Sequence, residues 1–390
     1  MLLIVAQLTD PNNSSTGYYW EKIVETLSKK EKILLVTEEK SSKLEKNSEV
    51  QILQVSIPNF LKNNLYLEKG FLPKLIISLK MLFFSIVNSK NKENILIGTN
   101  PFLIVLLPIF LRVFFIKTKI SILVFDLFPE NLISTSKSFI LKNISLMIKK
   151  FFDFAYRRFH KVFSIGKDMT EILVHKNINP QRIIYCPNWC DDDYSSRADE
   201  KKALLKSLGI EYESTKNIVI LYFGNLGYFQ NLEIFIDIIS KTKNKDLIFL
   251  FVGNGVKKNL IFEAAKLDNR IHLRDGVALS DRSKILLSGD ISLVTLSDEM
   301  LGLAVPSKSY FSLAYGMPLL TIMNKKSEVS SLVEENNFGW NFSSSETEEV
   351  SNFLESLTHD DIRNKQKDIF FRDEKFRSSK SLDVFLKNLV

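Results

Sequence analysis

Short apolar runs of strand type alternate with stretches of helical periodicity along most of this 390-residue chain. Within the runs, apolar residues follow one another without polar gaps, which is typical of strands buried on both faces of a parallel sheet. Helices must then cover both faces, so the pattern predicts an α/β fold. In the first half we expect strands at residues 2–8, 32–37, 50–56, 94–98, 120–125, 161–165 and 182–186, and helices at 17–29, 72–88, 138–158 and 168–176, with an apolar helix from Pro101.

The polar, charged stretch at residues 191–202 reads as a linker, and the alternation restarts after it. Two domains suit this length at ~100–200 residues per domain. We therefore predict two doubly wound, Rossmann-like domains, 1–190 and 191–390, that face each other across a cleft and bind ligands at strand carboxyl ends. In the second half we expect strands at 218–223, 247–252, 271–273, 291–296 and 319–323, with helices between them and amphipathic helical pieces from 346 to 390.

The two halves differ in charge. Residues 1–190 contain 26 Lys and Arg against 15 Asp and Glu, a net charge of +11. Residues 191–390 contain 26 against 30, a net charge of −4. A basic first half indicates an anionic partner, either a membrane surface or nucleic acid. No nucleic-acid-binding module and no interleaving of basic and aromatic residues on a strand is recognisable, so nucleic acid is disfavoured.

Several sequence signals bear on the compartment. Cys186 and Cys190 have no second Cys or His pair to complete a zinc site, so we interpret them as reduced thiols. The apolar stretch at 102–116 is interrupted by Pro108 and Arg112 and falls short of the ~20 residues of a spanning helix. The first residues lack the basic start of a secretory signal. We expect a cytoplasmic protein that is peripheral at the inner face of the cell membrane.

Glycine-bearing turns follow two strands of the second half. Gly224-Asn225-Leu226-Gly227 comes after the first strand and Gly253-Asn254-Gly255 after the next. Glycine allows backbone N–H groups to approach an anion closely. Neither turn has the dinucleotide-binding pattern, because position 258 is Lys, and no P-loop is present. A packing role for both turns stays open, as does a left-handed turn at Asn254.

The segment Val305-Pro306-Ser307-Lys308 opens a helix after a strand. Proline suits the first turn of a helix, and Ser307 and Lys308 there would place a hydroxyl, free N–H groups and an ammonium at one spot. That combination suits a diphosphate. The alternative is that Lys308 is an ordinary exposed first-turn lysine.

With these segments, the chain resembles the retaining GT-B-fold glycosyltransferases of glycosyltransferase family four. More narrowly, it resembles the bacterial surface-polysaccharide branch related to the L-fucosamine transferases of O-antigen assembly. The match runs in order from about residue 95 to 340. Its motifs are VFDLFPE from Val124, CPNW from Cys186, GNLG from Gly224, GNG from Gly253, GDI from Gly289, VPSK from Val305, LAYGMP from Leu313 and SE from Ser327.

The resemblance implies that the C-terminal domain holds a nucleotide-sugar donor, such as a UDP-sugar, and that the N-terminal domain holds the acceptor. It also implies retention of configuration at the anomeric carbon. The expected catalytic residues are Asp126, which ends a strand, and Glu130; each could instead serve only its local helix. Metal is not required, because Lys308 and helix N-termini can balance the diphosphate. The expected donor-binding residues are Gly17, Gly224, Asn225, Gly227, Asn254, Ser307, Lys308 and Glu328.

The chain also departs from the family's pattern. Many relatives carry Arg and Lys where this sequence has Asn225 and Gln230, and a pair of glutamates where it has Leu303 and Phe311. Glu328 is our substitute for the missing ribose-binding acid, although it would also suit a helix N-terminus. Gly17 lacks the usual neighbouring glycine, so its loop could simply cap a helix.

The basic helix expected near residues 138–158 has two interpretations. Ile140, Ile144, Met147, Ile148, Phe151 and Ala155 lie at helical spacing, with Lys142, Lys149, Asp153 and Arg157 opposite them. Either the apolar stripe packs on the sheet and the basic face is solvated, or the helix rests on anionic lipid.

Together these features predict transfer of a sugar from a nucleotide diphosphate to a polyprenyl-diphosphate-linked glycan, in O-antigen or capsule biosynthesis. The alternatives are a nucleotide-sugar epimerase of the same fold and a non-catalytic protein that binds glycans or partner proteins. The missing Arg, Lys and Glu positions favour the non-catalytic alternative.

Overall fold

The structure, a computed structural model, describes residues 1–57, 71–114, 118–135, 139–192, 198–278 and 281–389. The chain divides into two compact units. Unit 1 comprises residues 1–187, 302–304 and 379–390, and unit 2 comprises 188–301 and 305–378. The polypeptide therefore returns to unit 1 twice after it first leaves it, whereas the sequence assigned everything after residue 190 to one domain.

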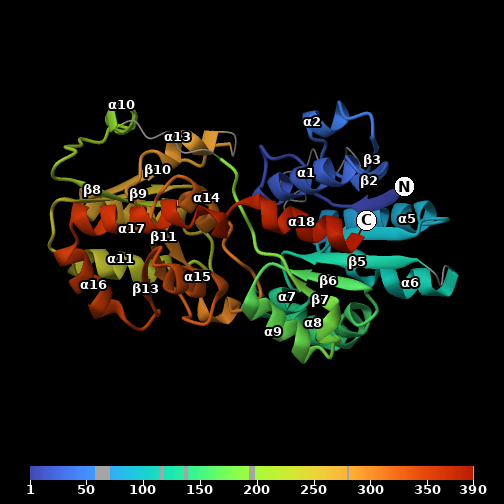
Figure 1. The fold of residues 1–390 in the computed structure, drawn as a ribbon. Helices are drawn as coiled ribbons and strands as arrows, with labels where there is room; N and C mark the ends of the chain where they lie inside the picture. Colours follow the sequence, from blue (N-terminus) through green and yellow to red (C-terminus); the bar gives the residue numbers. More distant parts are fainter. Residues whose placement is uncertain (58–70, 115–117, 136–138, 193–197, 279–280, 390) are drawn as a thin grey trace. The chain divides into compact units, whose positions relative to one another are not determined.

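Unit 1 is built on a seven-stranded parallel sheet in the order β3-β2-β1-β4-β5-β6-β7, with helices on both faces (Figure 1). The two strands at its centre, β1 and β4, are wholly or almost wholly buried, because helices cover them on both sides. The strands are β1 (Leu2–Val5), β2 (Ile33–Thr37), β3 (Val50–Gln54), β4 (Asn94–Gly98), β5 (Lys119–Val124), β6 (Lys161–Ser164) and β7 (Ile183–Tyr185).

The helices of unit 1 follow the expected alternation, but the short elements α2 and η2 and the C-terminal α18 were not expected there. The apolar helix begins as a 3₁₀ turn, η1, and continues as α6; the long basic helix is preceded by a separate short helix, α7. The described helices are α1 (Ser15–Ser28), α2 (Ser42–Glu45), α5 (Phe71–Asn88), η1 (Phe102–Leu106), α6 (Leu107–Phe114), α7 (Glu130–Thr135), α8 (Phe139–Tyr156), α9 (Lys167–His175), η2 (Pro180–Arg182) and the C-terminal α18 (Ser378–Leu389).

Unit 2 contains a six-stranded parallel sheet in the order β10-β9-β8-β11-β12-β13. The sequence pattern missed β13, a half-buried edge strand without a continuous apolar run. The strands are β8 (Ile218–Phe223), β9 (Leu247–Val252), β10 (Ile271–Arg274), β11 (Ile291–Thr295), β12 (Leu319–Ile322) and β13 (Gly339–Phe342). The helices are α10 (Ala198–Ser207), α11 (Leu232–Lys241), α12 (Lys258–Leu267), α13 (Arg282–Leu286), η4 (Asp298–Met300), α14 (Lys308–Ala314), α15 (Glu328–Asn336), α16 (Thr347–Ser356), α17 (His359–Phe371) and η5 (Asp373–Lys375).

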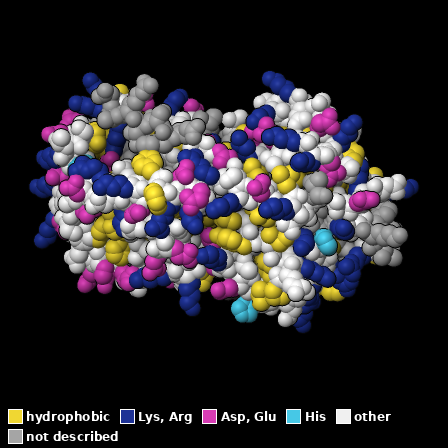
Figure 2. Space-filling view, in the orientation of Figure 1, with side chains coloured by type: hydrophobic (Ala, Val, Ile, Leu, Met, Phe, Trp, Pro, Cys, Tyr) yellow, Lys and Arg dark blue, Asp and Glu magenta, His cyan; other side chains and the backbone are white. Residues whose placement is uncertain are grey.

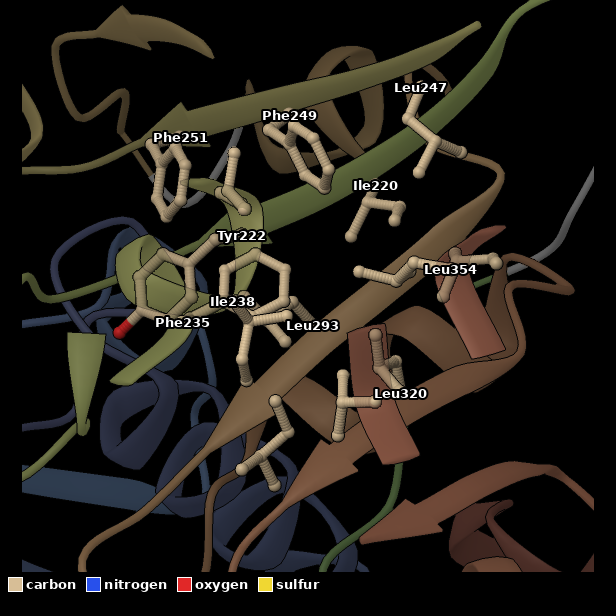
Figure 3. Close-up of a cluster of buried hydrophobic side chains, with 14 of the residues drawn as sticks. Ile220, Tyr222, Phe235, Ile238, Leu247, Phe249, Phe251, Leu293, Leu320 and Leu354 are labelled. Atoms are coloured by element: carbon tan, nitrogen blue, oxygen red, sulfur yellow. The ribbon is translucent and has the colours of Figure 1, made fainter. Parts of the chain in front are cut away.

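One face of the unit 2 sheet packs against α11 and α16 in a large apolar cluster (Figure 3). Phe235 of α11 stacks edge-on against Phe249 of β9, with ring centroids 5.8 Å apart. Leu354 of α16 closes the cluster from the next helix. Burial of each such side chain contributes about 1.5–3 kcal/mol, and this is the main term that holds the strands in place.

Both cysteines are buried. Cys186 lies near the end of the first segment of unit 1, and Cys190 lies near the start of unit 2. The structure contains them as free thiols, and burial raises the pKa of Cys186 and of Cys190 to about 12. At neutral pH both are therefore protonated and hidden from solvent.

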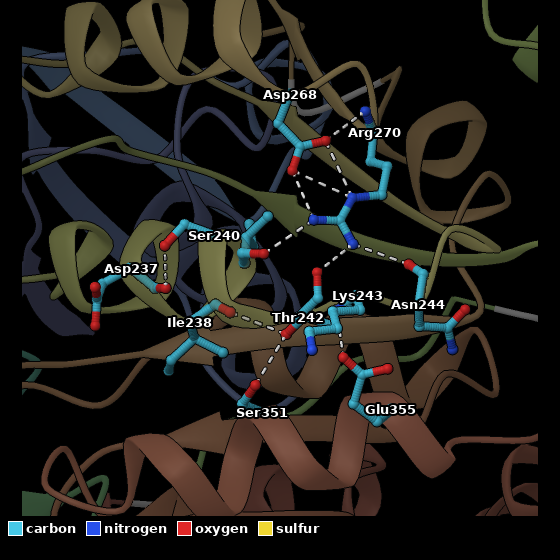
Figure 4. A network of polar contacts seen from close by, with 11 residues as sticks. Asp237, Ile238, Ser240, Thr242, Lys243, Asn244, Asp268, Arg270, Ser351 and Glu355 are labelled. Atoms are coloured by element: carbon cyan, nitrogen blue, oxygen red, sulfur yellow. Dashed lines mark hydrogen bonds and ion pairs between the residues drawn. The ribbon is translucent and has the colours of Figure 1, made fainter.

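The half-buried guanidinium of Arg270 connects the last turn of α11, the loop after it and the residue that ends α12 (Figure 4). Arg270 donates to the backbone carbonyls of Ile239, Thr242 and Asn244 at 2.8–2.9 Å. It also pairs with the Asp268 carboxylate, with Nη2 2.6 Å from Oδ2. These bonds lower the pKa of Asp268, because the hydrogen bonds from Arg270 outweigh the effect of burial. The network satisfies carbonyls in the last turn of α11 and in the loop after it; the Ile239 carbonyl also accepts from Thr242 N–H at 3.1 Å.

We predict that Arg270→Lys lowers the free energy of unfolding by about 2 kcal/mol, because a single ammonium cannot reach three carbonyls and a carboxylate. The midpoint of chemical unfolding measures this. The control Lys266→Ala removes only a surface pair with Glu263 and should change stability by less than about 0.5 kcal/mol. The stabilisation is present above the ordinary Asp268 pKa of 3.8 and is lost as the pH falls through its lowered value. Equal midpoints for both variants at pH 7 would contradict the prediction.

Candidate active site

Four neighbouring strands of unit 2 bring the predicted donor-binding residues of that unit to one edge of the sheet, whereas Gly17 lies in unit 1. In the order β9-β8-β11-β12, each strand is parallel to the next, so all carboxyl ends lie at the same edge. Asn254 follows β9, Gly224 follows β8, Lys308 follows β11 and Glu328 follows β12. The strand order reverses between β8 and β11, and such a switch point is where open α/β sheets bind ligands.

The two glycine turns at this edge interlock through their backbones. Gly224 N–H donates to the Val252 carbonyl at 3.0 Å, and Leu226 N–H donates to the Asn254 carbonyl at 2.9 Å. A Cβ at Gly253 would lie 1.9 Å from the Gly224 carbonyl oxygen, so no larger residue fits there. The positive φ in the second turn belongs to Gly255, at 151°, so the alternative of a left-handed Asn254 is wrong.

Lys308 enters this group from the first turn of α14. Its Nζ lies 3.5 Å from the centroid of the Tyr222 ring, and its Cδ lies close to Gly224. The Nζ atom is buried, and among the described residues it has no hydrogen-bond partner. The alternative of an exposed first-turn lysine is therefore wrong.

No nearby anion offsets the burial of the Lys308 ammonium among the described residues. Burial lowers its pKa to about 7, since little except the Tyr222 ring replaces the lost hydration of the ammonium. A buried polar group without a partner is unfavourable in the free protein. The helix that carries Lys308, α14, is short, with seven residues.

The remaining predicted donor residues occupy different surroundings. Ser307 is the N-cap residue of α14, beside Lys308. Glu328 is buried in the first turn of α15, where the Ser327 hydroxyl caps the helix. Asn225 is exposed, and its backbone carbonyl accepts from the Tyr222 hydroxyl at 2.6 Å. Gly227 is buried next to the Gln230 amide, whose Oε1 has no hydrogen-bond partner among the described residues.

The positions that carry glutamate in many relatives are apolar and buried here. Leu303 is buried, and its carbonyl accepts from Leu127 N–H at 3.1 Å. Phe311 is also buried, and the Arg282 guanidinium lies 4.9 Å from its ring centroid. Neither position supplies a carboxylate, and Glu328 remains our prediction for an acid that binds the donor.

In unit 1, Asp126 lies directly after β5 and is held by two amides. Its Oδ2 accepts from Asn100 at 3.3 Å and its Oδ1 from Asn131 at 3.2 Å. Its backbone forms an isolated antiparallel bridge with Ala304, in the segment that returns to unit 1. Burial raises the pKa of the Asp126 carboxyl above its usual range. A carboxyl with raised pKa that is oriented by two neutral donors suits proton acceptance.

Glu130 lies in a cluster of ion pairs rather than in an open site. Its Oε1 is 2.5 Å from Nζ of Lys149 and 2.5 Å from Nζ of the buried Lys176. Both lysines also contact Asp153. Burial alone would raise the pKa of Asp153, but hydrogen bonds from Lys176 and Lys149 lower it. The Glu130 carboxylate is therefore part of an ion-pair cluster with two ammonium groups.

Gly17 lies in the first turn of α1 rather than in an open loop. The Ser14 hydroxyl accepts from its N–H at 2.9 Å and caps the helix. A Cβ at this position would lie 2.2 Å from the Asp10 carbonyl oxygen. The helix cap and the close approach of Asp10 thus account for a glycine at position 17. A contact between Gly17 and the donor stays a prediction.

Three further residues contact the predicted site residues without a motif that points to them. Tyr222 is the last but one residue of β8, and its ring supports Lys308. Asn100 follows β4, the strand next to β5, and Asn131 lies five residues after Asp126. Polar residues at the carboxyl ends of adjacent parallel strands were the available signal for Asn100.

Among the described residues, no group of three or more His, Cys, Asp and Glu could hold a metal ion.

No protein-family profile matches the chain. It is 29% identical over 354 residues to the probable glycosyltransferase WbjE of Pseudomonas aeruginosa, an alignment that covers 87% of this chain and 85% of that protein. Of the solved structures, Anabaena Alr3699/HepE in complex with UDP-glucose superposes with a TM-score of 0.71 at 12% identity, over 100% of this chain and 99% of that one. WaaG, a glycosyltransferase involved in lipopolysaccharide biosynthesis, superposes with a TM-score of 0.70 at 12% identity, over 98% and 99%.

The structural similarities confirm the predicted fold class, two Rossmann-like units with parallel sheets. The similarity to WbjE extends over most of both chains and confirms the resemblance to glycosyltransferases that the motifs indicated. Retention of configuration and the L-fucosamine transferase branch stay predictions. The chain is a glycosyltransferase with the GT-B fold.

Proposed function

We propose that this enzyme transfers a sugar from a nucleotide-diphosphate donor, in our prediction a UDP-sugar, to a lipid-linked glycan during assembly of a bacterial surface polysaccharide such as O-antigen or capsule. The observation that carries the proposal is the buried ammonium of Lys308, which lacks an anionic partner at the carboxyl edge of the unit 2 sheet. WaaG and HepE, which share the fold, support a donor of this class: one acts in lipopolysaccharide biosynthesis and the other was solved with UDP-glucose.

On the donor side, Lys308 would contact the diphosphate beside the Gly224–Gly227 turn, and Glu328 would bind the ribose or the sugar. The diphosphate would supply the negative charge that Lys308 lacks in the free protein, so its binding would relieve the unfavourable burial of the ammonium. We expect charge stabilisation of the leaving group by Lys308, Ser307 and backbone N–H groups, without a required metal.

On the acceptor side, Asp126 would accept a hydroxyl proton or orient the acceptor. In the retaining reaction that we propose, the departing diphosphate helps to take this proton on the same face of the sugar, while the protein orients both substrates. The acceptor would be a polyprenyl-diphosphate-linked glycan at the inner face of the cell membrane. The basic first half of the chain supports this location, since such a surface is anionic.

We predict that one nucleoside diphosphate among UDP, GDP, dTDP and ADP raises the unfolding temperature, with UDP as the expected ligand. Ligand at 100 times its dissociation constant stabilises the bound fold by about 2.7 kcal/mol. Lys308→Ala should abolish the shift because the diphosphate loses its cation. Lys325→Ala is the matched control, since Lys325 is an exposed lysine of the same unit, paired with Glu346.

No shift with any nucleotide would instead favour the non-catalytic alternative. Release of free UDP from a UDP-sugar in the absence of acceptor would favour the epimerase.

We further predict that nucleotide binding takes up a proton above pH 7. Lys308, with a pKa of about 7, is mostly neutral at pH 8 in the free protein, and a bound diphosphate favours its protonated form. Affinity should therefore fall as the pH rises from 7 to 9. Calorimetry in buffers of different ionisation enthalpy measures the uptake, which should approach about one proton at pH 8 and decline towards pH 6. Uptake that persists in Lys308→Met would assign the proton to another group.

For the acceptor side, we predict that Asp126→Asn lowers turnover by about 10²-fold or more, because the amide cannot accept the proton. The nucleotide-induced thermal shift should remain, since Asp126 lies in unit 1. Transfer of radiolabelled sugar to lipid extracts of the native cell measures turnover. Asn131→Ala removes one of the two amides that orient Asp126 and should give a smaller loss. Turnover within threefold of wild type in Asp126→Asn would remove this residue from the chemistry.

A further inference from the structure

Three helices of unit 1 carry apolar side chains on their outer faces. On α5, Leu72, Leu79, Phe83 and Val87 are exposed and recur at helical spacing, so they form one stripe. The opposite side of the same helix is buried through Ile77 and Met81. The helix is therefore apolar all round, although only one side packs on the sheet.

The orientation of α8 corrects the sequence interpretation. The side chains that pack inward are Phe152, Ala155 and Tyr156. Of the predicted stripe, Ala155 is buried as expected, but Ile144 is exposed, Met147 is 70% exposed and Phe151 65%. The interpretation of a helix with a buried apolar stripe and a solvated basic face is therefore wrong for these three residues. Ile140 and Lys142 have side chains outside the described part of the structure.

The helices that carry the outer apolar residues are neighbours in unit 1. The short helix α6 packs against both α5 and α8, and its Val113 is 73% exposed, with Phe110 also exposed. The 3₁₀ turn η1 contacts all three helices, α5, α6 and α8. We call the exposed apolar side chains of α5, α6 and α8 the outer apolar face. Isolated exposed apolar residues are common, but a contiguous group marks an interaction site.

Charge decides between the possible partners of this face. By sequence, α5, α6 and α8 contain six Lys and Arg and a single acidic residue, Asp153, a net charge of +5. Asp153 is ion-paired with Lys149 and Lys176, so it does not offset the remaining cations. Lys74, Arg112, Lys150 and Arg157 are exposed beside the apolar residues. Figure 2 shows Lys and Arg side chains gathered over the region of α6 and α8, next to hydrophobic patches.

This combination matches the surface of an anionic bilayer. Basic side chains interact with lipid headgroups, and aromatic and aliphatic side chains enter the boundary with the acyl chains. The Arg158 guanidinium lies 4.2 Å from the Phe154 ring centroid, which brings both kinds of group together at one place. Among the described residues, no helix is long and apolar enough to cross a membrane.

We propose that the outer apolar face of α5, α6 and α8 docks unit 1 onto an anionic lipid bilayer, with Met147, Phe151 and Val113 inserted and Lys150, Arg157 and Arg112 on the headgroups. The inference deepens the proposed function, because it gives the surface through which the enzyme meets the membrane of its lipid-linked acceptor. Lys149 contributes to the fold through Glu130 rather than to the membrane contact.

The test is co-sedimentation of the full chain with vesicles of phosphatidylcholine, with and without phosphatidylglycerol, at low and high salt. We expect Met147→Ser/Phe151→Ser to bind at least tenfold more weakly at both salt concentrations, because apolar insertion is insensitive to salt. Lys150→Glu/Arg157→Glu should lose binding only where phosphatidylglycerol is present, and chiefly at low salt, by about fivefold or more per residue.

The matched control is Leu267→Ser/Phe371→Ser, which changes two exposed apolar residues of unit 2 and should bind vesicles like the wild type. All variants should keep the nucleotide-induced thermal shift, which separates loss of docking from failure of the proposed function. Equal vesicle binding by wild type and Met147→Ser/Phe151→Ser would overturn the proposal. So would a stable dimer in sedimentation equilibrium that only this variant disrupts, since the face would then bind a second copy.

Discussion

Parallel pairing of the strands is the constraint on which the rest of this structure depends. Every strand of both sheets runs in the same direction within its sheet, so all loops that follow strands meet at one edge. Residues as distant in sequence as Gly224 and Lys308 become neighbours for this reason alone. The apolar core, with Phe235 against Phe249, fixes the sheet rigidly enough for a side chain at its edge to be held without a partner. The candidate donor site therefore depends first on the strand order of the sheet and only then on individual motifs.

The candidate donor site differs from that of many relatives in where its charged side chains lie. In place of Arg and Lys after β8, this chain has Asn225 and Gln230, neither of which carries charge. A single ammonium on the aromatic ring of Tyr222 remains, and burial makes its protonation depend on what binds. A cation in such surroundings interacts with a diphosphate more strongly than a solvated one would, because little water screens it.

Sequence reasoning predicted the fold well because strand patterns and turn glycines are local signals. The strand β8, with its run of six apolar residues, and the turn at Gly224 could both be read directly. The edge strand β13 and the inward face of α8 could not, because both depend on which neighbours cover a residue. The ion pairs of Glu130 were equally hidden, since Lys176 is 46 residues away in sequence. Lys308 was identified by its place after a proline, but its burial followed only from the packing of Tyr222.

The two native thiols have a practical consequence. Cys186 and Cys190 are buried and remain protonated at neutral pH, so neither should react readily with alkylating reagents in the folded protein. A cysteine introduced on the surface would thus be the preferred target of a spin label or fluorophore without prior removal of the natural pair. Depth measurements by paramagnetic quenching or environment-sensitive emission could then follow single positions on an otherwise unaltered chain.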